Sequence, residues 1–305
     1  MAHTHDHAHV HGADNLKSLN TAFIAGIALN TLYVVIEAVY GLVYGSMGLL
    51  SDAGHNLSDV GALLIAMVAY RLALRRPNRR LTYGYRKFTV QASFINALLL
   101  CVAIGAILVE AVRKLMHPTA VDGDVIAWVA AAGVVVNGVT AWLFMKDQKR
   151  DLNIKAAFLH MAADTLVSVG VVISGVIIHF THCYIIDPVI GIVIAVVIAW
   201  SMRHLLVEST RLSIDAVPDT IDMDCLEHAL ESSPGVVSIH HLHVWPLSTT
   251  ETALTVHAVV ADTHDIDAII ERMKKAAKAC GVSHSTIEAE TSAARCHDEA
   301  IFDDD

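Results

Sequence analysis

Six apolar runs, each about as long as a bilayer is thick, dominate the first two thirds of the chain. They lie at about 21–44, 49–72, 88–113, 122–146, 156–180 and 184–206. A helix needs about 20 apolar residues to cross the hydrocarbon core. The chain is 54% hydrophobic, above the roughly 45–50% of a typical soluble protein. The sequence therefore predicts an all-α membrane bundle of six helices over residues 21–208.

Positively charged side chains are unevenly divided between the connections of these runs. The first and fifth connections contain no Lys or Arg, whereas the second, the fourth and the exit of the sixth run are basic. The residues are Arg71, Arg75, Arg76, Arg79, Arg80, Arg86, Lys87, Lys146, Lys149, Arg150, Lys155, Arg203 and Arg211. Because basic connections stay on the cytoplasmic side, we expect a multi-pass protein with both termini in the cytoplasm.

Asn30, Glu37 and Asn137 interrupt the apolar runs, and we expect interhelical hydrogen bonds from them.

Residues 1–20 form a histidine-rich segment that we expect to be a disordered cytoplasmic tail. His3, His5, His7, His9 and His11 alternate with small or acidic residues, a spacing typical of neither a packed helix nor a core strand. Short His-rich tracts bind metal weakly, and a solvated tail is the alternative. The segment lacks the charged and apolar regions of a cleavable signal peptide.

Residues 209–292 have the pattern of a small soluble domain. Helix, strand, strand, helix and strand are predicted, in that order, at 221–232, 236–246, 252–261, 265–280 and 282–290. This α-β-β-α-β order predicts an α+β domain with its helices on one face of the sheet. Residues 293–305 read as an acidic tail. The net charge of −10 and the lack of a basic patch argue against nucleic acid as a partner, and five scattered Cys argue against a disulfide framework or a thiolate zinc site.

Two His-x-x-x-Asp pairs stand at the heads of apolar runs, in the second and the fifth predicted helix. They are His55 with Asp59, and His160 with Asp164. Residues four apart lie on one face of a helix, and ionisable groups at membrane depth usually face the bundle interior and mark ion pathways. Two imidazoles and two carboxylates make a tetrahedral set suited to a divalent metal such as zinc. Asp52, one turn before His55, suits a gate, a cap or an entry position rather than this shell.

The charge and the coordination of such a site favour carrying a metal ion over catalysis. Two carboxylates neutralise a divalent cation, and metal ligands must be deprotonated, so protons and metal compete for the site. Four protein ligands leave no open position for the activated water of a catalytic zinc site. An intramembrane metalloenzyme, which would favour a His-Glu-x-x-His pattern, and a membrane-tethered metal sensor remain as alternatives.

The run from Gly45 to Asp59, with its core Ser51-Asp-Ala-Gly-His-Asn-Leu-Ser-Asp59, resembles the second-helix signature of the cation diffusion facilitator family. Tyr83-Gly-Tyr-Arg-Lys87, the His160–Asp164 pair and Ile186-Asp-Pro188 fit the same pattern. The resemblance implies a six-helix bundle with a metallochaperone-like cytoplasmic domain. It also implies a homodimer in a cell (inner) membrane that exports zinc and similar divalent ions, such as cadmium and cobalt, in exchange for protons. It also implies that His55, Asp59, His160 and Asp164 bind the transported ion.

By the same resemblance, the family's cytoplasmic metal site maps to five residues, with zinc as a regulatory ion. They are His240, His257, His284, Glu288 and Glu290. His284 can also be aligned with a shift of one residue, and Cys296 and His297 offer further ligands from the tail. Strand alternation predicts His241 and His243 on the face opposite to His240.

Overall fold

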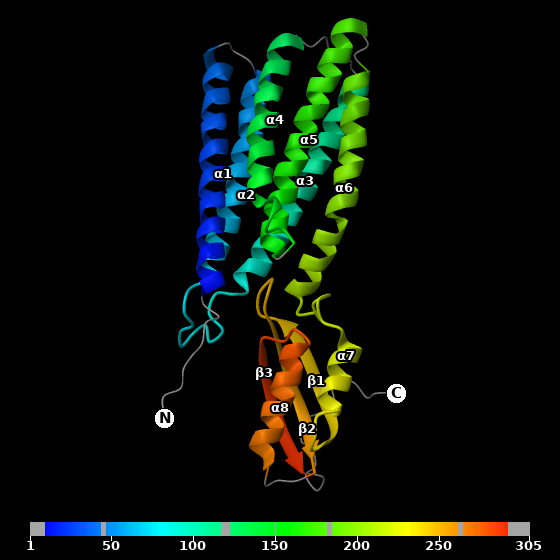
Figure 1. Cartoon of the computed structure of the whole chain (residues 1–305). Helices are drawn as coiled ribbons and strands as arrows, with labels where there is room; N and C mark the ends of the chain where they lie inside the picture. Colours follow the sequence, from blue (N-terminus) through cyan, green and yellow to red (C-terminus); the bar gives the residue numbers. More distant parts are fainter. Residues whose placement is uncertain are drawn as a thin grey trace. The chain divides into compact units, whose positions relative to one another are not determined.

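The computed structural model describes residues 10–43, 47–116, 123–149, 151–181, 185–261 and 265–291. The chain divides into two compact units, residues 1–209 and 210–305, which are described separately below. Six helices make up the described part of the first unit, and the last of them continues to Ser213, just beyond its end (Figure 1). They are α1 (Val10–Val43), α2 (Met47–Ala73), α3 (Phe88–Met116), α4 (Gly123–Met145), α5 (Leu152–Thr181) and α6 (Ile186–Ser213).

Each of the six predicted runs coincides with one helix, so the prediction of a six-helix bundle is confirmed. Within the described residues, Thr21–Tyr40 and Phe88–Met116 are long and apolar enough to cross a membrane. Large apolar side chains face outward on several helices, among them Trp128, Phe180 and Trp200, each more than 70% exposed. Such a surface is typical of a bundle that is surrounded by lipid rather than by water.

The expectation of disorder over residues 1–20 is wrong from Val10 onward, because α1 begins there. Residues 13–20 contain neither proline nor glycine, so no residue stops the helix of the first apolar run from continuing toward the N-terminus. His3, His5, His7 and His9 lie outside the described residues.

Buried polar side chains connect the helices of the bundle. Asn30 on α1 donates to Thr140 Oγ1 on α4 at 3.0 Å, and Asn56 on α2 donates to Glu37 Oε2 on α1 at 2.7 Å. The expectation of interhelical hydrogen bonds from Asn30 and Glu37 is therefore confirmed, and Asn137 is buried. In an apolar bundle such bonds satisfy groups that lipid cannot, and they fix the neighbours of each helix.

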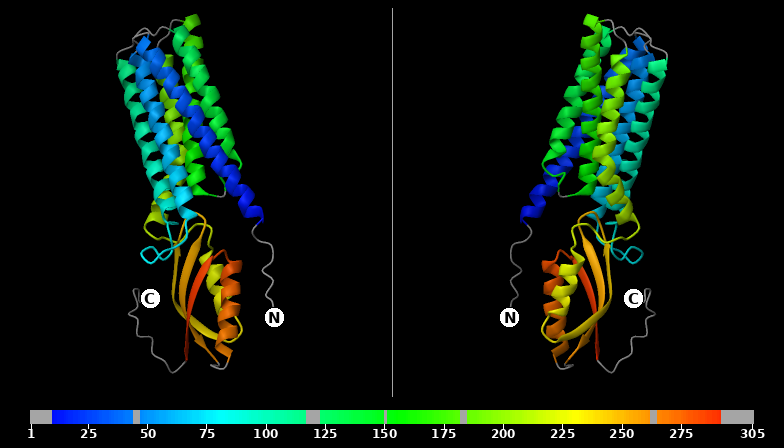
Figure 2. Two further views of the ribbon diagram at one scale, coloured as in Figure 1. Left: turned by 90° about the vertical axis from the view of Figure 1, so that its left-hand side faces the viewer. Right: turned by 90° about the vertical axis from the view of Figure 1, so that its right-hand side faces the viewer.

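The second unit is an α+β fold, as the sequence predicts. Two helices, α7 and α8, cover one face of a three-stranded sheet in which β1 pairs antiparallel and β3 parallel with the central β2 (Figures 1 and 2). Leu226 of α7, Leu254 of β2 and Met273 of α8 are fully buried between the helices and the sheet. The elements are α7 (Met223–Glu231), β1 (Val236–Pro246), β2 (Thr252–Val260), α8 (Ile266–Ala279) and β3 (His284–Thr291).

Candidate metal centres

Three of the four ligands predicted in the bundle lie together. Asp59 of α2 and His160 and Asp164 of α5 each offer a ligand atom within 4.8 Å of the others, and all three are buried. His160 Nε2 lies 2.7 Å from Asp59 Oδ1 and 3.8 Å from Asp164 Oδ2. The contact between His160 and Asp59 joins two helices that are separated by about a hundred residues of sequence.

Local hydrogen bonds position α5 against α2. Asp151 caps α5, because its Oδ1 accepts from the backbone N–H of Asn153 at 2.7 Å and of Ile154 at 3.2 Å. The Asn153 side chain then donates to Ala66 O of α2 at 2.9 Å. Asn153 precedes His160, and Ala66 follows Asp59, by about two helical turns. The Asn153–Ala66 bond therefore sets the register in which His160 meets Asp59.

The fourth predicted ligand, His55, lies on α2 one turn before Asp59. Its side chain, like that of Asp52, lies outside the part of the structure that is described. Between His55 and Asp59, the buried Asn56 is directed toward α1, where it donates to Glu37. The inclusion of His55 therefore stays a prediction from the i,i+4 spacing.

The chemistry of the bundle cluster suits a divalent cation that exchanges with protons. Two carboxylates and an imidazole are withdrawn from water, with Asp59 1%, His160 5% and Asp164 7% exposed. Buried charges are tolerated when they are paired or bind a metal ion, and the short His160–Asp59 contact is such a pairing. Oxygen and nitrogen donors of this kind accept zinc and similar ions, but only in their deprotonated forms.

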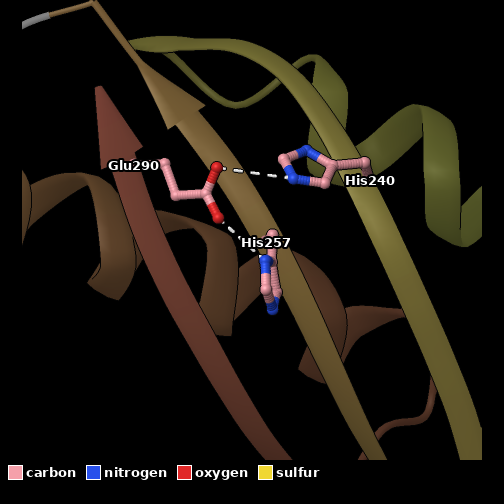
Figure 3. Close-up of side chains that lie close together, drawn as sticks. All are labelled: His240, His257 and Glu290. Atoms are coloured by element: carbon pink, nitrogen blue, oxygen red, sulfur yellow. Dashed lines mark hydrogen bonds and ion pairs between the residues drawn. The ribbon is translucent and has the colours of Figure 1, made fainter. Parts of the chain in front are cut away.

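A second cluster lies on the sheet of the α+β unit, with one residue from each strand (Figure 3). The carboxylate of Glu290 on β3 contacts both His240 on β1 and His257 on β2: its Oε1 is 2.8 Å from His257 Nδ1 and its Oε2 is 3.4 Å from His240 Nε2. Ligand atoms of the three residues lie within 4.8 Å of one another, and all three are half-buried. Two imidazoles and a carboxylate are a donor set that fits zinc.

Of the other ligands predicted in this unit, Glu288 is close and His284 is not. Glu288 Oε2 lies 3.7 Å from His257 Nε2. His284 pairs with Ala253 at the start of β3, whereas Glu288 pairs with His257, so about 13 Å of strand separates the His284 and Glu288 backbones. Cys296 and His297 lie outside the described residues.

His241 joins this cluster, although strand alternation places it on the opposite face from His240. The β1–β2 register shifts between His240 and His243, and His241 has a φ of +51°. This bulge turns the His241 ring back, so that it stacks on His257 with centroids 5.2 Å apart. The predicted alternation is therefore wrong at His241, because a bulge adds one residue to one strand and breaks the period of two. It is also wrong at His243, which pairs with Thr255 while His240 pairs with His257, so that His243 returns to the face of His240. Two adjacent histidines, His240 and His241, inside a predicted strand were the signal available in the sequence.

Comparison with known protein families identifies the family of this chain from two matching domains. The model of the cation efflux transmembrane domain matches residues 23–212, which is most of the chain. The chain belongs to the cation diffusion facilitator family. The model of the cytoplasmic domain of cation efflux proteins matches residues 218–292, so the chain is a membrane protein with both parts of the family architecture.

Three relatives illustrate the similarity within the cation diffusion facilitators. A cadmium, cobalt and zinc/H(+)-K(+) antiporter of Bacillus velezensis is 34% identical over 99% of this chain and 96% of its own length. A zinc transporter ZitB of Pectobacterium atrosepticum is 36% identical over 98% of this chain and 91% of its own. A metal cation efflux system protein CzcD of Cupriavidus metallidurans is 33% identical over 93% and 89%.

Proposed function

We propose that this protein is a zinc/proton antiporter that exports Zn²⁺ from the cytosol. The observation that carries the proposal is the buried Asp59, His160 and Asp164 cluster, with its ligand atoms within 4.8 Å on two helices of a membrane bundle. The relatives support it, because their names describe zinc transport and cadmium, cobalt and zinc antiport. A membrane-tethered sensor and an intramembrane metalloenzyme are less favoured, since the family and these relatives are transporters.

The proposed mechanism couples the metal to protons through shared ligands. Asp59, His160 and Asp164, with His55 as the fourth ligand, hold the ion when all four are deprotonated. When the ion leaves, the same carboxylates and imidazoles take up protons, because adjacent buried carboxylates repel one another when both are charged. Movement of metal in one direction is therefore tied to movement of protons in the other, as the bundle exposes the site first to one side and then to the other.

The remaining parts of the proposal concern assembly, topology and regulation. We propose a homodimer in a cell membrane with both termini in the cytoplasm, as the distribution of Lys and Arg predicts. The proposal also keeps the domain boundaries predicted from the sequence, which are 1–20, 21–208, 209–292 and 293–305.

His240, His257 and Glu290 would hold a regulatory zinc ion, with Glu288 beside them. The half-buried position of this cluster lets it equilibrate with metal in solution.

Transport by purified protein in liposomes tests the bundle site. In Asp59→Asn and in His160→Ala we expect zinc uptake to fall to the level of empty liposomes, because each change removes a ligand. Glu208→Gln is the matched control: it also removes a carboxylate from the bundle, but Glu208 interacts with His204 and Lys155 instead. We expect Glu208→Gln to keep most of the uptake. Wild-type rates in an Asp59→Asn/Asp164→Asn double variant would show that the ion does not bind here.

Coupling is measured in the same liposomes with a fluorescent pH indicator inside. Zinc uptake should rise when the imposed pH gradient drives protons outward, and a zinc gradient alone should move protons against the zinc flux. A zinc transport rate that does not change with the pH gradient would mean that the protein is a uniporter, even if the residues of the site proved correct.

A further inference from the structure

Two cysteines that are far apart in the sequence lie in contact on the helical face of the α+β unit. Cys225 is in the first turn of α7 and Cys280 is the C-cap of α8. Their sulfur atoms are 4.0 Å apart, and Cys280 Sγ also lies 4.0 Å from the carbonyl oxygen of Cys225. Neither cysteine has a role in the proposed metal sites.

The backbone at both cysteines is fixed, so their contact follows from the fold. The Cys225 N–H donates to Oδ1 of the N-cap Asp222 at 3.1 Å. The Cys280 N–H donates to Ala277 O at 3.1 Å, and Gly281, with a φ of +92°, ends the helix directly after it. Because α7 and α8 cover the same face of the sheet (Figure 2), the first turn of one meets the last turn of the other.

The two thiols differ in their access to solvent. Cys225 is exposed, whereas Cys280 is half-buried and packs against the hydrophobic core. Burial, followed by the hydrogen bond with Cys225, raises the pKa of the Cys280 thiol above its ordinary value. A raised pKa means less thiolate at a given pH, and the thiolate is the reactive form. An exposed thiol beside a protected one is a suitable arrangement for stepwise exchange with a small disulfide.

We propose that Cys225 and Cys280 are a thiol–disulfide exchange site that reacts with a low-molecular-weight disulfide such as oxidised glutathione. The Cys225 thiolate attacks one sulfur of the oxidant, forming a mixed disulfide and releasing one glutathione thiolate. The Cys280 thiolate then attacks Cys225 Sγ, so that the intramolecular disulfide forms and the second glutathione leaves. Each departing thiolate takes up the proton that a protein thiol gave up, and two protein thiols and one glutathione disulfide become one protein disulfide and two glutathione molecules.

The bond would tie the start of α7 to the end of α8. The segment that it closes includes β1 and β2, and therefore His240 and His257 but not Glu290. A cross-link over such a segment restricts the unfolded chain and stabilises the fold. The two sulfurs are 4.0 Å apart, so they must approach by about 2 Å to reach the length of a disulfide bond.

Peptide mapping of the full-length protein tests the proposal. The protein in detergent is equilibrated with mixtures of oxidised and reduced glutathione, its free thiols are blocked, and proteolytic peptides are analysed by mass spectrometry. We expect a peptide pair joined through Cys225 and Cys280 whose amount rises with the proportion of oxidised glutathione, and which disappears after reduction. If both cysteines remain free, or carry separate glutathione adducts, or link to another chain at equilibrium, the proposal is wrong.

Single variants test the order of the two steps. In C280S we expect a stable glutathione adduct on Cys225, because the second thiol is missing. In C225S we expect the glutathione adduct on Cys280 to form several-fold more slowly than the adduct on Cys225 forms in C280S. C101S is the matched control, since Cys101 lies on α3 against Met202, and its loss should leave the cross-linked peptide unchanged. An adduct on Cys280 of C225S that forms as fast as the one on Cys225 of C280S would overturn the assigned order.

Discussion

At the residue scale, the two candidate metal clusters both combine imidazoles with carboxylates, but in different surroundings. The bundle cluster of Asp59, His160 and Asp164 is buried, whereas His240, His257 and Glu290 are half-buried on a sheet. Withdrawal from water makes an unpaired charge costly, so the bundle cluster must always be neutralised by metal, by protons or by its own imidazole. The sheet cluster remains partly hydrated and has no such requirement. The difference suits carrying an ion in the first case and sensing its concentration in the second.

Replacement of Glu290 by Gln tests the sheet cluster. Because Glu290 is the carboxylate that contacts both imidazoles, we expect the E290Q change to weaken zinc binding at this site by about tenfold or more. Isothermal titration in an Asp59→Asn background, which removes a ligand of the bundle site, measures this. Glu231→Gln on the exposed face of α7 is the control and should bind as the parent does. Equal zinc affinity in both variants would exclude Glu290 as a ligand.

At the scale of the element, short turns decide how α7, α8 and the sheet pack. Gly235 connects α7 to β1 with a φ of +97°, a conformation that side chains with a Cβ rarely adopt. A Cβ at this position would lie 2.7 Å from Ile269 Cδ1 and 2.8 Å from Ile269 Cγ1, and Ile269 is 2% exposed. The turn therefore requires glycine for both its backbone and the closeness of α8.

We expect Gly235→Ala to destabilise the α+β unit by about 1–3 kcal/mol, because it combines a strained φ with overpacking. Hydrogen exchange followed by mass spectrometry should show faster exchange in β1 and β2, with the bundle unchanged. Gly105→Ala on α3 is the control, because a Cβ there meets no neighbouring atom within 4 Å. Exchange in the strands that is as slow as in the parent would mean that the turn adapts to the added methyl group.

At the scale of the whole molecule, the two units hold separate candidate sites. The bundle contains the cluster proposed for transport, and residues 210–305 contain the sheet cluster and the cysteine pair. Each cluster draws its ligands from within one unit. Removal of the second unit should therefore leave the geometry of the first intact.

Truncation after Ser213, where α6 ends, tests this division. We expect the truncated protein to keep a residual zinc flux that still responds to a pH gradient, because all four proposed transport ligands remain. Zinc flux in liposomes is the measurement, and the helical content from circular dichroism is the control for folding. A folded bundle without any flux would favour a protein whose function resides in the second unit, as the sensor alternative requires.

The sequence by itself determined the elements and their order. Six apolar runs set six helices, and the α-β-β-α-β pattern set the second fold, because periodicity and turn residues act within a few neighbours along the chain. The i,i+4 spacing of His160 and Asp164 placed both on one face of α5 for the same reason. The start of α1 at Val10 was missed, since histidine and polar residues do not stop a helix that is already under way.

Contacts between distant segments were decided by the tertiary structure alone. Only the packing of α5 on α2 brings His160 to Asp59, only the bulge in β1 turns His241 toward His257, and only the common face of α7 and α8 joins Cys225 to Cys280. The register of β3 against β2 likewise places Glu288, and not His284, opposite His257. The physical reason is the same in each case: spacing along a chain fixes the direction of a side chain, whereas the packing of the elements determines what it meets.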